Sequence, residues 1–300
     1  MEILENLHSI KNLSLALGYF DGVHKGHQKV IKSAVNYAKE NNTKSAVITF
    51  KKNPLELFYN EDFKYIITKE FKHQKMKELG VDYLFELDFN NEMSKITGEN
   101  YLKDILIKYF SPISVSTGFN HTFGANKSGN TDLLERMQKE FNYKYFKIDA
   151  EKLNDEIISS TAIKKSLING DIIKANSMLG YDYTISGTII EGNKIGRTIG
   201  FPTANICYPT ELVALPYGAY STKTKVEGDK SIYNSITNFG KKPTVCNNCK
   251  EVVEVNIFNF DKNIYNRKIT VSFLKRIRNE EKFSSIEELK QQIKEDISKC

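Results

Sequence analysis

The stretch Leu15-Ala-Leu-Gly-Tyr-Phe-Asp-Gly-Val-His-Lys-Gly-His-Gln28 decides the fold of the first half of the chain. It begins with apolar residues, as a buried strand does, and this run breaks at Gly18. Asp21 and Gly22 then turn the chain, and apolar residues recur at helical spacing from about Gly26 onward. The stretch therefore predicts a strand, a glycine-rich turn and a helix.

The turn and the start of the helix have the features of a phosphate site. Glycines let a backbone approach a phosphate closely, and a helix N-terminus presents free N–H groups and the positive end of its dipole. His24 and His27 flank Gly26, and their spacing places both on one face, where both can contact the same anion. Two alternatives remain, a metal pair and two solvated histidines. The metal is less favoured because no nearby cluster of carboxylates or cysteines completes a set of ligands.

The motif differs from the phosphate loop of kinases, since no Gly-x-x-x-x-Gly-Lys-Ser/Thr is present. His-x-Gly-His after a first strand resembles instead the nucleotidyltransferase superfamily, whose members transfer a nucleotide from a triphosphate to a phosphate or a similar acceptor. The resemblance implies that His24 and His27 are catalytic and steady the α-phosphate. It also implies that residues of the turn bind the nucleotide: Gly18, Phe20, Asp21 and Gly22.

Length and composition indicate a globular protein. A chain of 300 residues favours two domains over one, and an apolar fraction of 40% is enough for packed cores. No run of about 18 apolar residues is present, so no membrane span is expected. The acidic start of the chain lacks the pattern of an export signal, which predicts a cytoplasmic protein. Four cysteines in a chain of this length do not predict a disulfide scaffold.

The net charge of +6 is unevenly divided. Residues 183–300 hold 18 Lys and Arg against 13 Asp and Glu, whereas residues 1–182 hold 25 against 24. The second half therefore favours anionic ligands. No basic stripe interleaved with aromatic residues and no known nucleic-acid motif is present, so we expect neither nucleic acid nor a membrane as a partner.

Strands alternate with helices through the first half of the chain. This order predicts a parallel sheet with right-handed crossovers, and such sheets bind ligands at the carboxyl ends of their strands. After the first strand and helix, strands are expected at 44–50, 81–87, 114–117 and 143–148, and helices at 68–79, 98–109 and 131–141.

Two further motifs are expected at the same edge of this sheet. In residues 117–124 glycines bracket Asn120, whose amide suits a ribose hydroxyl or a phosphate, although a loop Asn can also satisfy its own turn. In residues 158–165 either Ser159 or Ser160 can cap the helix that follows, and hydroxyls with lysine there can hold a polyphosphate. The alternative for this segment is a capped surface helix with solvated lysines.

Together the three motifs resemble the adenylyltransferase module of bacterial bifunctional riboflavin kinase/FAD synthetases. The family carries Gly-x-Phe-Asp-Gly-Val-His-x-Gly-His, a Gly-x-Asn/Asp-x-x-Phe-Gly loop and Ser-Ser-Thr-x-Ile-Arg. The chain departs from it at Lys164, where Arg is usual and where Lys keeps the charge but loses the bidentate fork. It also departs at Asn53, where His is commoner. The resemblance implies nucleotide-binding roles for Asn120, Ser159, Ser160, Thr161 and Lys164, and flavin-binding roles for Phe50, Pro54 and Phe123.

The pattern changes near Tyr183, where short alternating segments replace the long amphipathic helices. Even spacing with turn residues between the segments predicts a small closed antiparallel barrel. We therefore place the modules at residues 1–182 and 183–300. Strands of the second module are expected at 183–190, 218–226, 231–237, 252–258 and 268–274.

A terminal helix is expected from Ser284, because Ser284 and Glu287 have the spacing of a capping box. Its apolar residues Ile286, Leu289 and Ile293 recur at helical spacing and predict a face packed on the core.

The second module carries its own glycine-rich motif, which runs from Gly192 to Asn205. Gly196 and Gly200 allow a loop to lie against phosphates. Thr203 and Asn205 are two residues apart, so in an extended segment both side chains point the same way. Their oxygen atoms are hard ligands suited to Mg²⁺ carried on ATP. The alternative is a glycine-rich hairpin with an ordinary proline turn.

The string Gly-Phe-Pro-Thr-Ala-Asn205 resembles the riboflavin kinase signature, and matches in the same order follow to the end of the chain. The resemblance implies that Glu254 is the catalytic carboxylate, since a primary hydroxyl must lose a proton as it attacks a γ-phosphate. It also implies nucleotide-binding roles for Gly192, Gly196 and Gly200 and flavin-binding roles for Arg278 and Phe283. The lone Cys246-Asn-Asn-Cys249 has no second pair at zinc spacing and is interpreted as a loop feature.

The sequence as a whole predicts a two-module enzyme that makes flavin cofactors. One module is expected to convert riboflavin to FMN with Mg·ATP, and the other to convert FMN to FAD with release of pyrophosphate. Two alternatives remain: a riboflavin kinase whose first module is inactive, and a flavin-sensing regulatory protein. We expect small-molecule partners only and a monomer or a weak homo-oligomer.

Overall fold

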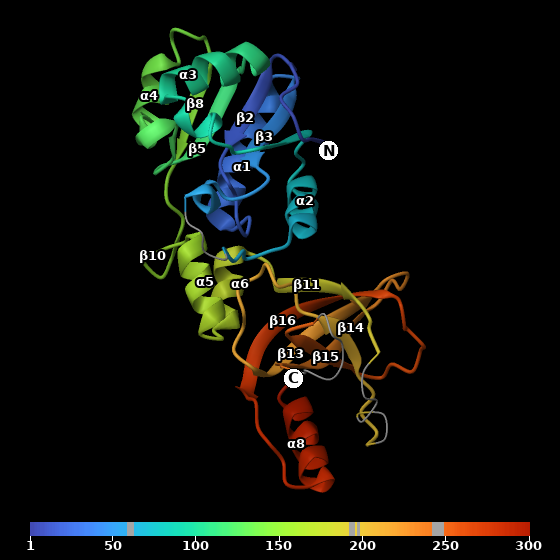
Figure 1. Cartoon of the computed structure of the whole chain (residues 1–300). Helices are drawn as coiled ribbons and strands as arrows, with labels where there is room; N and C mark the ends of the chain where they lie inside the picture. Colours follow the sequence, from blue (N-terminus) through green and yellow to red (C-terminus); the bar gives the residue numbers. More distant parts are fainter. Residues whose placement is uncertain (59–62, 192–195, 197–198, 242–248) are drawn as a thin grey trace. The chain divides into compact units, whose positions relative to one another are not determined.

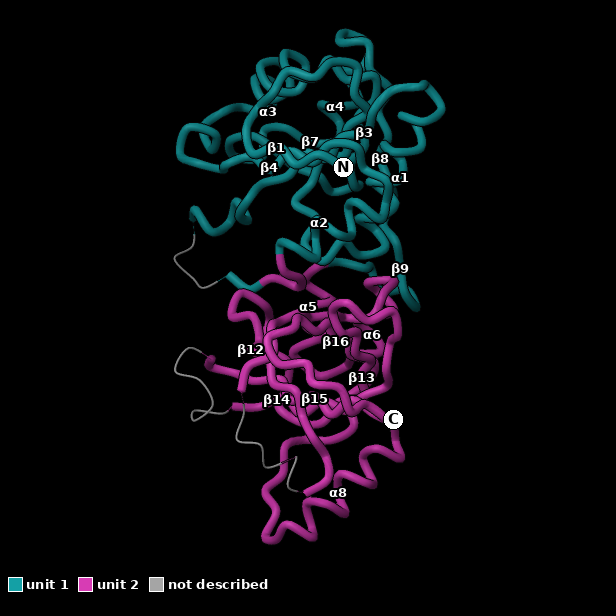
Figure 2. The backbone as a smooth tube through the Cα atoms, turned by 90° about the vertical axis from the view of Figure 1, so that its right-hand side faces the viewer, with its two compact units in different colours: residues 1–64, 69–159 teal, residues 65–68, 160–300 magenta. Residues whose placement is uncertain are grey.

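The computed structural model describes residues 1–58, 63–191, 196, 199–241 and 249–300. They form two compact units, shown in two colours in Figure 2. The first unit comprises residues 1–64 and 69–159, and the second comprises residues 65–68 and 160–300. Among the described helices, none has the length and apolar character needed to cross a bilayer.

The first unit is built on a parallel sheet, as the alternation of strands and helices predicted (Figure 1). Every neighbouring pair in this sheet runs parallel. The short edge strand β1 was not predicted, because three residues are too few to show alternation. In spatial order the strands are β1 (Glu2–Leu4), β4 (Tyr83–Leu87), β3 (Lys44–Phe50), β2 (Leu13–Leu17), β5 (Ser114–Gly118) and β8 (Lys144–Ile148).

Helices cover both faces of the parallel sheet. Ser116 of β5 donates from its hydroxyl to Ser33 of α1 (Lys25–Glu40) over 3.1 Å, so α1 lies on that face. The preceding residue, Val115, points to the other face and packs with Leu102 and Leu106. Two-sided burial explains why the strands read as continuous apolar runs rather than alternating ones.

The remaining helices of the first unit match the expected positions with shifted ends. The helix expected at 98–109 is a short α-helical turn followed by a π-helix, and the helix expected at 131–141 ends earlier. Two small two-stranded ribbons complete the unit. These elements are α2 (Lys69–Glu78), α3 (Gly98–Asn100), the π-helix η3 (Tyr101–Phe110), α4 (Thr131–Met137), β6 (Thr122–Phe123), β7 (Gly129–Asn130), β9 (Lys152–Leu153), β10 (Glu156–Ile157) and the 3-10 turns η1 (Pro54–Leu57), η2 (Met93–Lys95) and η4 (Ala125–Lys127).

The second unit is a six-stranded antiparallel barrel with helices attached, which confirms the predicted architecture. The backbone N–H of Ile190 donates to the carbonyl of Asn205 over 2.8 Å and so links the two outer strands of the order. The order is β11 (Tyr183–Thr188), β16 (Lys268–Asn279), β13 (Gly218–Val226), β14 (Ile232–Gly240), β15 (Val252–Ile257) and β12 (Ala204–Cys207), and the helices are α5 (Ser160–Ile168), α6 (Ile172–Leu179) and α8 (Ile286–Ser298).

The terminal helix α8 is capped one residue later than predicted. Its cap is Ser285, whose hydroxyl accepts from the backbone N–H of Glu288 over 3.1 Å, while Ser284 donates to the Glu288 carboxylate. The predicted pairing of Ser284 with Glu287 is therefore wrong. The predicted core face is also wrong at Ile286, which is 54% exposed.

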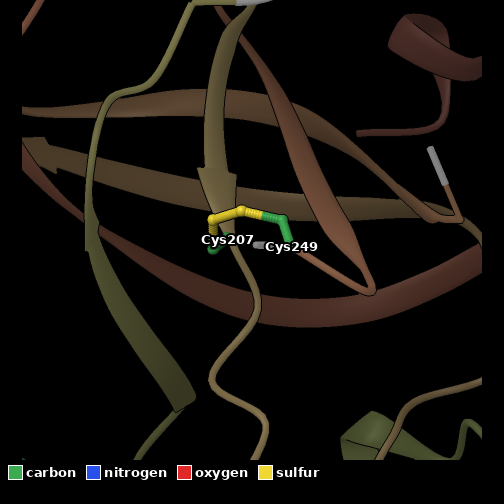
Figure 3. The surroundings of a disulfide bond; sticks show 2 residues. All are labelled: Cys207 and Cys249. Carbon is green, nitrogen blue, oxygen red and sulfur yellow. A yellow bond between two sulfur atoms is a disulfide. The ribbon is translucent and has the colours of Figure 1, made fainter. Parts of the chain in front are cut away.

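One disulfide joins Cys207, at the end of β12, to Cys249, just before β15 (Figure 3). Their Cα atoms are 5.5 Å apart, within the usual range for a disulfide. This bridge joins two neighbouring strands of the barrel. It does not amount to a disulfide scaffold, which the number of cysteines had already made unexpected. The sequence grouped Cys249 with Cys246 instead, because the pairing of β12 with β15 was not predicted. Cys246 lies outside the described residues.

Candidate functional site

His24 and His27 lie together at the N-terminus of α1, as predicted. His24 caps the helix, and its Nδ1 accepts from the backbone N–H of His27 over 3.3 Å. The two imidazole rings stack with centroids 3.5 Å apart and planes 22° apart. Gly26 allows this arrangement, since a Cβ there would lie 3.2 Å from the His24 ring.

Both histidines are neutral at neutral pH, because loss of contact with water lowers the pKa of each ring. Burial lowers the pKa of His24 to about 4. Burial lowers the pKa of His27 well below its usual value, and repulsion from a protonated His24 and from Lys72 lowers it further. Among the described residues, Nδ1 of His27 is buried and has no hydrogen-bond partner. An imidazole nitrogen without a partner can carry a proton and donate it to a bound anion. Such an anion would raise the pKa values of His24 and His27.

The turn before α1 adopts a strained backbone conformation. Phe20 has a φ of 60° and Val23 a φ of 37°, a region that residues other than glycine rarely occupy. The ring of Phe20 lies under Gly18, where an added Cβ would approach it to 2.9 Å. The same ring meets the His27 ring edge-on at 5.2 Å. The conformation of the turn therefore sets the position of His27.

The loop after β5 places Asn120 beyond the carboxyl end of a strand adjacent to β2, as predicted, with its side chain exposed. The glycines of this loop have a packing role. A Cβ on Gly124 would lie 2.4 Å from the backbone of Gly98, and one on Gly129 would lie 2.5 Å from the ring of Phe123. They hold the loop against the start of α3, a contact that the sequence pattern did not reveal.

The residues predicted to contact the flavin in the first module, and Asn53 beside them, make packing or capping contacts within the protein. Phe50 meets Phe89 edge-on at 5.2 Å, and Phe123 packs on Tyr101 at 5.5 Å. Asn53 accepts from the backbone N–H of Leu55 over 3.0 Å and so caps the 3-10 turn that begins at Pro54. The departure from the family's His at position 53 is thus compatible with a defined capping role.

The segment from Ser159 to Lys164 was expected directly after a strand of the parallel sheet. In the structure the β9–β10 ribbon lies between the last strand of the sheet and this segment. Ser160 begins α5. Ser159 belongs to the first unit, whereas Ser160, Thr161 and Lys164 belong to the second. Their predicted contact with the nucleotide stays a prediction.

In the second unit, register partners form one polar row across the barrel. Asn205 of β12 pairs with Glu254 of β15, which pairs with Asn238 of β14. Asn238 pairs with Ala219 of β13, and Ala219 with Arg278 of β16. All five line a cavity of about 320 Å³, which also contains Gly196, Phe283 and the α8 residues Leu289 and Ile293.

A second cavity of about 460 Å³ adjoins this row. Thr203 and Asn205 line both cavities, in agreement with the prediction that their side chains share a face. Aromatic and basic side chains complete the second cavity, including Phe260, Tyr265 and Lys262. A group held by Thr203 and Asn205 would therefore lie where the two cavities meet.

The predicted metal ligands fit a hard cation. Asn205 is 5% exposed, and its Oδ1 is buried with no hydrogen-bond partner among the described residues. A buried amide oxygen without a partner is costly, and an oxygen-seeking cation would satisfy it. Thr203 is exposed at the cavity. The part of the chain that the structure describes contains no group of three or more His, Cys, Asp or Glu placed to hold a metal.

Arg278 and Phe283, both predicted to contact a flavin, lie together at the first cavity. The Arg278 guanidinium is 5.5 Å from the centroid of the Phe283 ring. Its Nε donates to the buried carboxylate of Asp296 of α8 over 2.8 Å. Gln292 donates to the other oxygen of Asp296 over 2.9 Å. Helix α8 thus fixes the orientation of an arginine in the cavity wall.

Comparisons with known proteins match the two parts of the chain to two different family models. A family model described as FAD synthetase matches residues 7–162, and one described as riboflavin kinase matches residues 179–300. A bifunctional riboflavin kinase/FMN adenylyltransferase from Buchnera aphidicola is 36% identical, over 99% of this chain and 97% of the relative. The chain belongs to the bifunctional riboflavin kinase/FMN adenylyltransferase family.

Other similar proteins extend over nearly the same length. A family member from Bacillus subtilis is 38% identical over 94% of this chain and 89% of its own. A solved structure described as a macrolide-efflux protein from Streptococcus pneumoniae is 28% identical, with a TM-score of 0.89 over 99% of this chain and 98% of that one. The two-unit architecture is thus found in an experimental structure as well.

Sequence reasoning missed three residues that the structure places beside predicted site residues or beside the turn that carries them. Asn238 belongs to a motif that was matched to the family, but only strand register shows that it neighbours Glu254. Asp296 reads as an ordinary helix carboxylate until its burial is known. Lys72 of α2 contacts the His24 turn from a helix whose lysines all read as surface residues.

Proposed function

We propose that the chain makes FMN and FAD. Residues 183–300 would phosphorylate riboflavin with ATP, and residues 1–182 would transfer AMP from a second ATP to the FMN phosphate, with release of pyrophosphate. The observation that carries this proposal is the polar row at the barrel cavity, where Glu254 lies directly between Asn205 and Asn238. The row places a carboxylate next to an amide oxygen that lacks a partner.

For the kinase reaction we assign riboflavin to the cavity lined by Glu254, Arg278 and Phe283. The nucleotide then occupies the adjoining cavity, because phosphoryl transfer requires the two ligands to meet at Thr203 and Asn205. Glu254 accepts the proton of the attacking hydroxyl. Thr203 and Asn205 would hold the Mg²⁺ that accompanies ATP, which when bound neutralises charge on the phosphates. Gly192 lies outside the described residues, and its contact with the nucleotide, like those of Gly196 and Gly200, is part of this proposal.

For the adenylyl transfer we assign the α-phosphate of ATP to the His24–His27 pair. An oxygen of the FMN phosphate attacks the α-phosphorus, and pyrophosphate leaves with the electrons of the broken P–O bond. No covalent bond to the protein is required. The two imidazoles stabilise the charge that develops on the α-phosphate, and the burial of His24 strengthens its interaction. Asn120, Ser159, Ser160, Thr161 and Lys164 complete the proposed nucleotide site, with Gly18, Phe20, Asp21 and Gly22 of the turn.

The flavin ring in the first module would rest near η1. Phe50 and Pro54 are assigned to this contact, and Leu55 and Phe58 beside them are 50% and 61% exposed. Exposed apolar side chains of this size are suited to cover a flat aromatic ligand. Phe123 is assigned to the same ligand. We further propose that the protein acts in the cytoplasm, as a monomer or a weak homo-oligomer, with small molecules as its only substrates.

One incubation distinguishes the proposal from its alternatives. The protein is mixed with riboflavin, ATP and Mg²⁺, and the flavins are separated by chromatography. FAD would support both modules, and FMN alone would leave a riboflavin kinase with an inactive first module. Unchanged riboflavin that nevertheless binds would indicate a flavin sensor. A parallel incubation that starts from FMN tests the adenylyl transfer by itself.

A further inference from the structure

Lys72 of α2 is a buried lysine that contacts the turn before α1. Only 7% of its surface is exposed, although it lies on a helix whose other lysines are more accessible. Its Nζ donates to the backbone carbonyl of Tyr19 over 2.7 Å and to the hydroxyl of Thr49 over 3.1 Å. It also lies 4.5 Å from the centroid of the Tyr19 ring. A buried ammonium in contact with neutral acceptors is unusual and calls for a function.

The carbonyl of Tyr19 is held from two sides. Besides Lys72, the hydroxyl of Thr49 in β3 donates to it over 3.0 Å. The next residue is Phe20, with its strained φ of 60°. Strained backbone persists only where its surroundings fix it, and these two donors grip the peptide group at the start of the strained segment.

The side chain of Phe20 connects the held Tyr19 peptide group to His27. Phe20 is 3% exposed and meets the His27 ring edge-on at 5.2 Å. Rotation of the Tyr19–Phe20 peptide would move the Phe20 ring, and His27 would lose the surface that sets its orientation. Lys72 therefore acts on the imidazole through one peptide and one ring.

The charge of Lys72 also acts on His27 directly, because its positive charge contributes to the low pKa of that imidazole. Burial lowers the pKa of Lys72 itself to about 8, against the opposing charges of Glu86 and Asp21 and with a further small decrease from Lys69. Glu86 of β4 is in turn bound by Lys69 at 3.1 Å and His73 at 3.0 Å. Its charge is thus shared with two other side chains.

We propose that Lys72 is a positioning residue for adenylyl transfer: it fixes the Tyr19–Phe20 turn that orients His27. This inference rests on the function proposed for the His24–His27 pair. In this proposal Lys72 acts through the protein, since its Nζ donates to Tyr19 and Thr49.

The test compares Lys72→Met, which keeps the length of the side chain, with Thr49→Val, which removes the other donor but leaves the charge. Lys77→Met, on the exposed side of α2, is the matched control. FAD formation from FMN is the assay, and FMN formation from riboflavin in the same chain reports on folding. Lys72→Met should lower kcat for FAD formation by about 100-fold, with little change in KM for FMN, as expected for a displaced catalytic group. Thr49→Val should lower kcat severalfold, and Lys77→Met should match the parent.

Two further readouts separate positioning from packing. FAD formation by the parent should decline above about pH 8, as Lys72 loses its proton, and this decline should be absent in Lys72→Met. In NMR titrations of the free protein, the His27 ring should take up its proton at a higher pH in Lys72→Met than in Thr49→Val.

The proposal is overturned if Lys72→Met makes FAD at the parent rate or keeps the alkaline decline. If Lys72→Met loses FMN and FAD formation equally, Thr49→Val and the parent's pH profile decide, and a parent-like result in both reduces Lys72 to a packing residue. A parent protein that makes FMN but no FAD would refute adenylyl transfer itself. The His27 titration would still decide whether Lys72 acts on that imidazole.

Discussion

The two proposed sites position their polar groups by different means. In the first unit, the positions of His24 and His27 depend on a strained turn and on side chains behind it, such as Phe20 and Lys72. In the barrel, Asn205, Glu254 and Asn238 are neighbours because their strands are paired in register. Backbone hydrogen bonds between the strands fix the positions of these residues, whatever their side chains are. We therefore expect substitutions to act locally in the barrel and to spread through the backbone in the first unit.

The largest expected effect is at Glu254, where only the proton acceptor should be lost. Glu254→Gln keeps the shape of the side chain, so riboflavin and ATP should still bind while FMN formation falls by about 1,000-fold. FAD formation from supplied FMN should be unchanged. The exposed Glu287→Gln in α8 is the control. Parent-like FMN formation by Glu254→Gln would remove this strand from the catalytic assignment.

The next effect concerns the histidine pair. His27→Ala should lower FAD formation from FMN by about 100-fold, the usual result of losing one charge-stabilising donor. His24→Asn should do the same while keeping an acceptor for the helix cap, which separates catalysis from capping. FMN formation should change little in either variant. His8→Ala, on an exposed histidine, should have no effect. Equal loss of both activities would contradict two separate sites.

The metal ligands should have a smaller effect. Thr203→Ala and Asn205→Ala each remove one oxygen ligand, so the Mg²⁺ concentration for half-maximal FMN formation should rise by about tenfold. Thr203→Ser, which keeps the hydroxyl, should resemble the parent. Activity is measured as Mg²⁺ is varied at fixed ATP. An unchanged Mg²⁺ dependence in both alanine variants would place the metal elsewhere.

Acid should destabilise the first unit more than the barrel. His24 has a pKa of about 4 when folded and about 6.5 when unfolded, so the unfolded chain binds more protons between these values. Stability is therefore complete above pH 6.5 and falls as the pH drops toward 4, by about 1 kcal/mol per pH unit for this group. Denaturant unfolding at several pH values measures the slope, which His24→Asn should reduce. Binding of ATP should raise the histidine pKa values and draw protons from the buffer at pH 6.

The smallest effect is expected at Lys164. Lys164→Arg restores the planar fork usual in the family and should keep or tighten ATP affinity in FAD formation, by no more than about threefold. Lys165→Arg, on the exposed neighbour, is the control. A clear loss of affinity in Lys164→Arg would show that the site is shaped around lysine.

The same contrast explains what the sequence could predict. The parallel sheet, the barrel and the placement of His24 with His27 follow from local patterns, and all are present in the structure. The pairing of β12 with β15 joins segments far apart in the chain, so the neighbours of Glu254 and the Cys207–Cys249 bridge could not be read from spacing. Lys72 was missed for another reason. Burial of one lysine among several on a helix depends on what packs against it, and periodicity does not report this.

The segment at residues 65–68 has a consequence for anyone who separates the two activities. Tyr65 belongs to the second unit, where its backbone donates to the carbonyl of Glu211 over 2.8 Å and accepts from the N–H of Val213 over 2.9 Å. A gene fragment that begins at residue 160 would lack Tyr65 and would leave the backbone groups of Glu211 and Val213 without these two hydrogen bonds. Such a fragment should be less stable to denaturant, and a synthetic peptide of residues 63–70 should restore part of the stability by remaking these two hydrogen bonds.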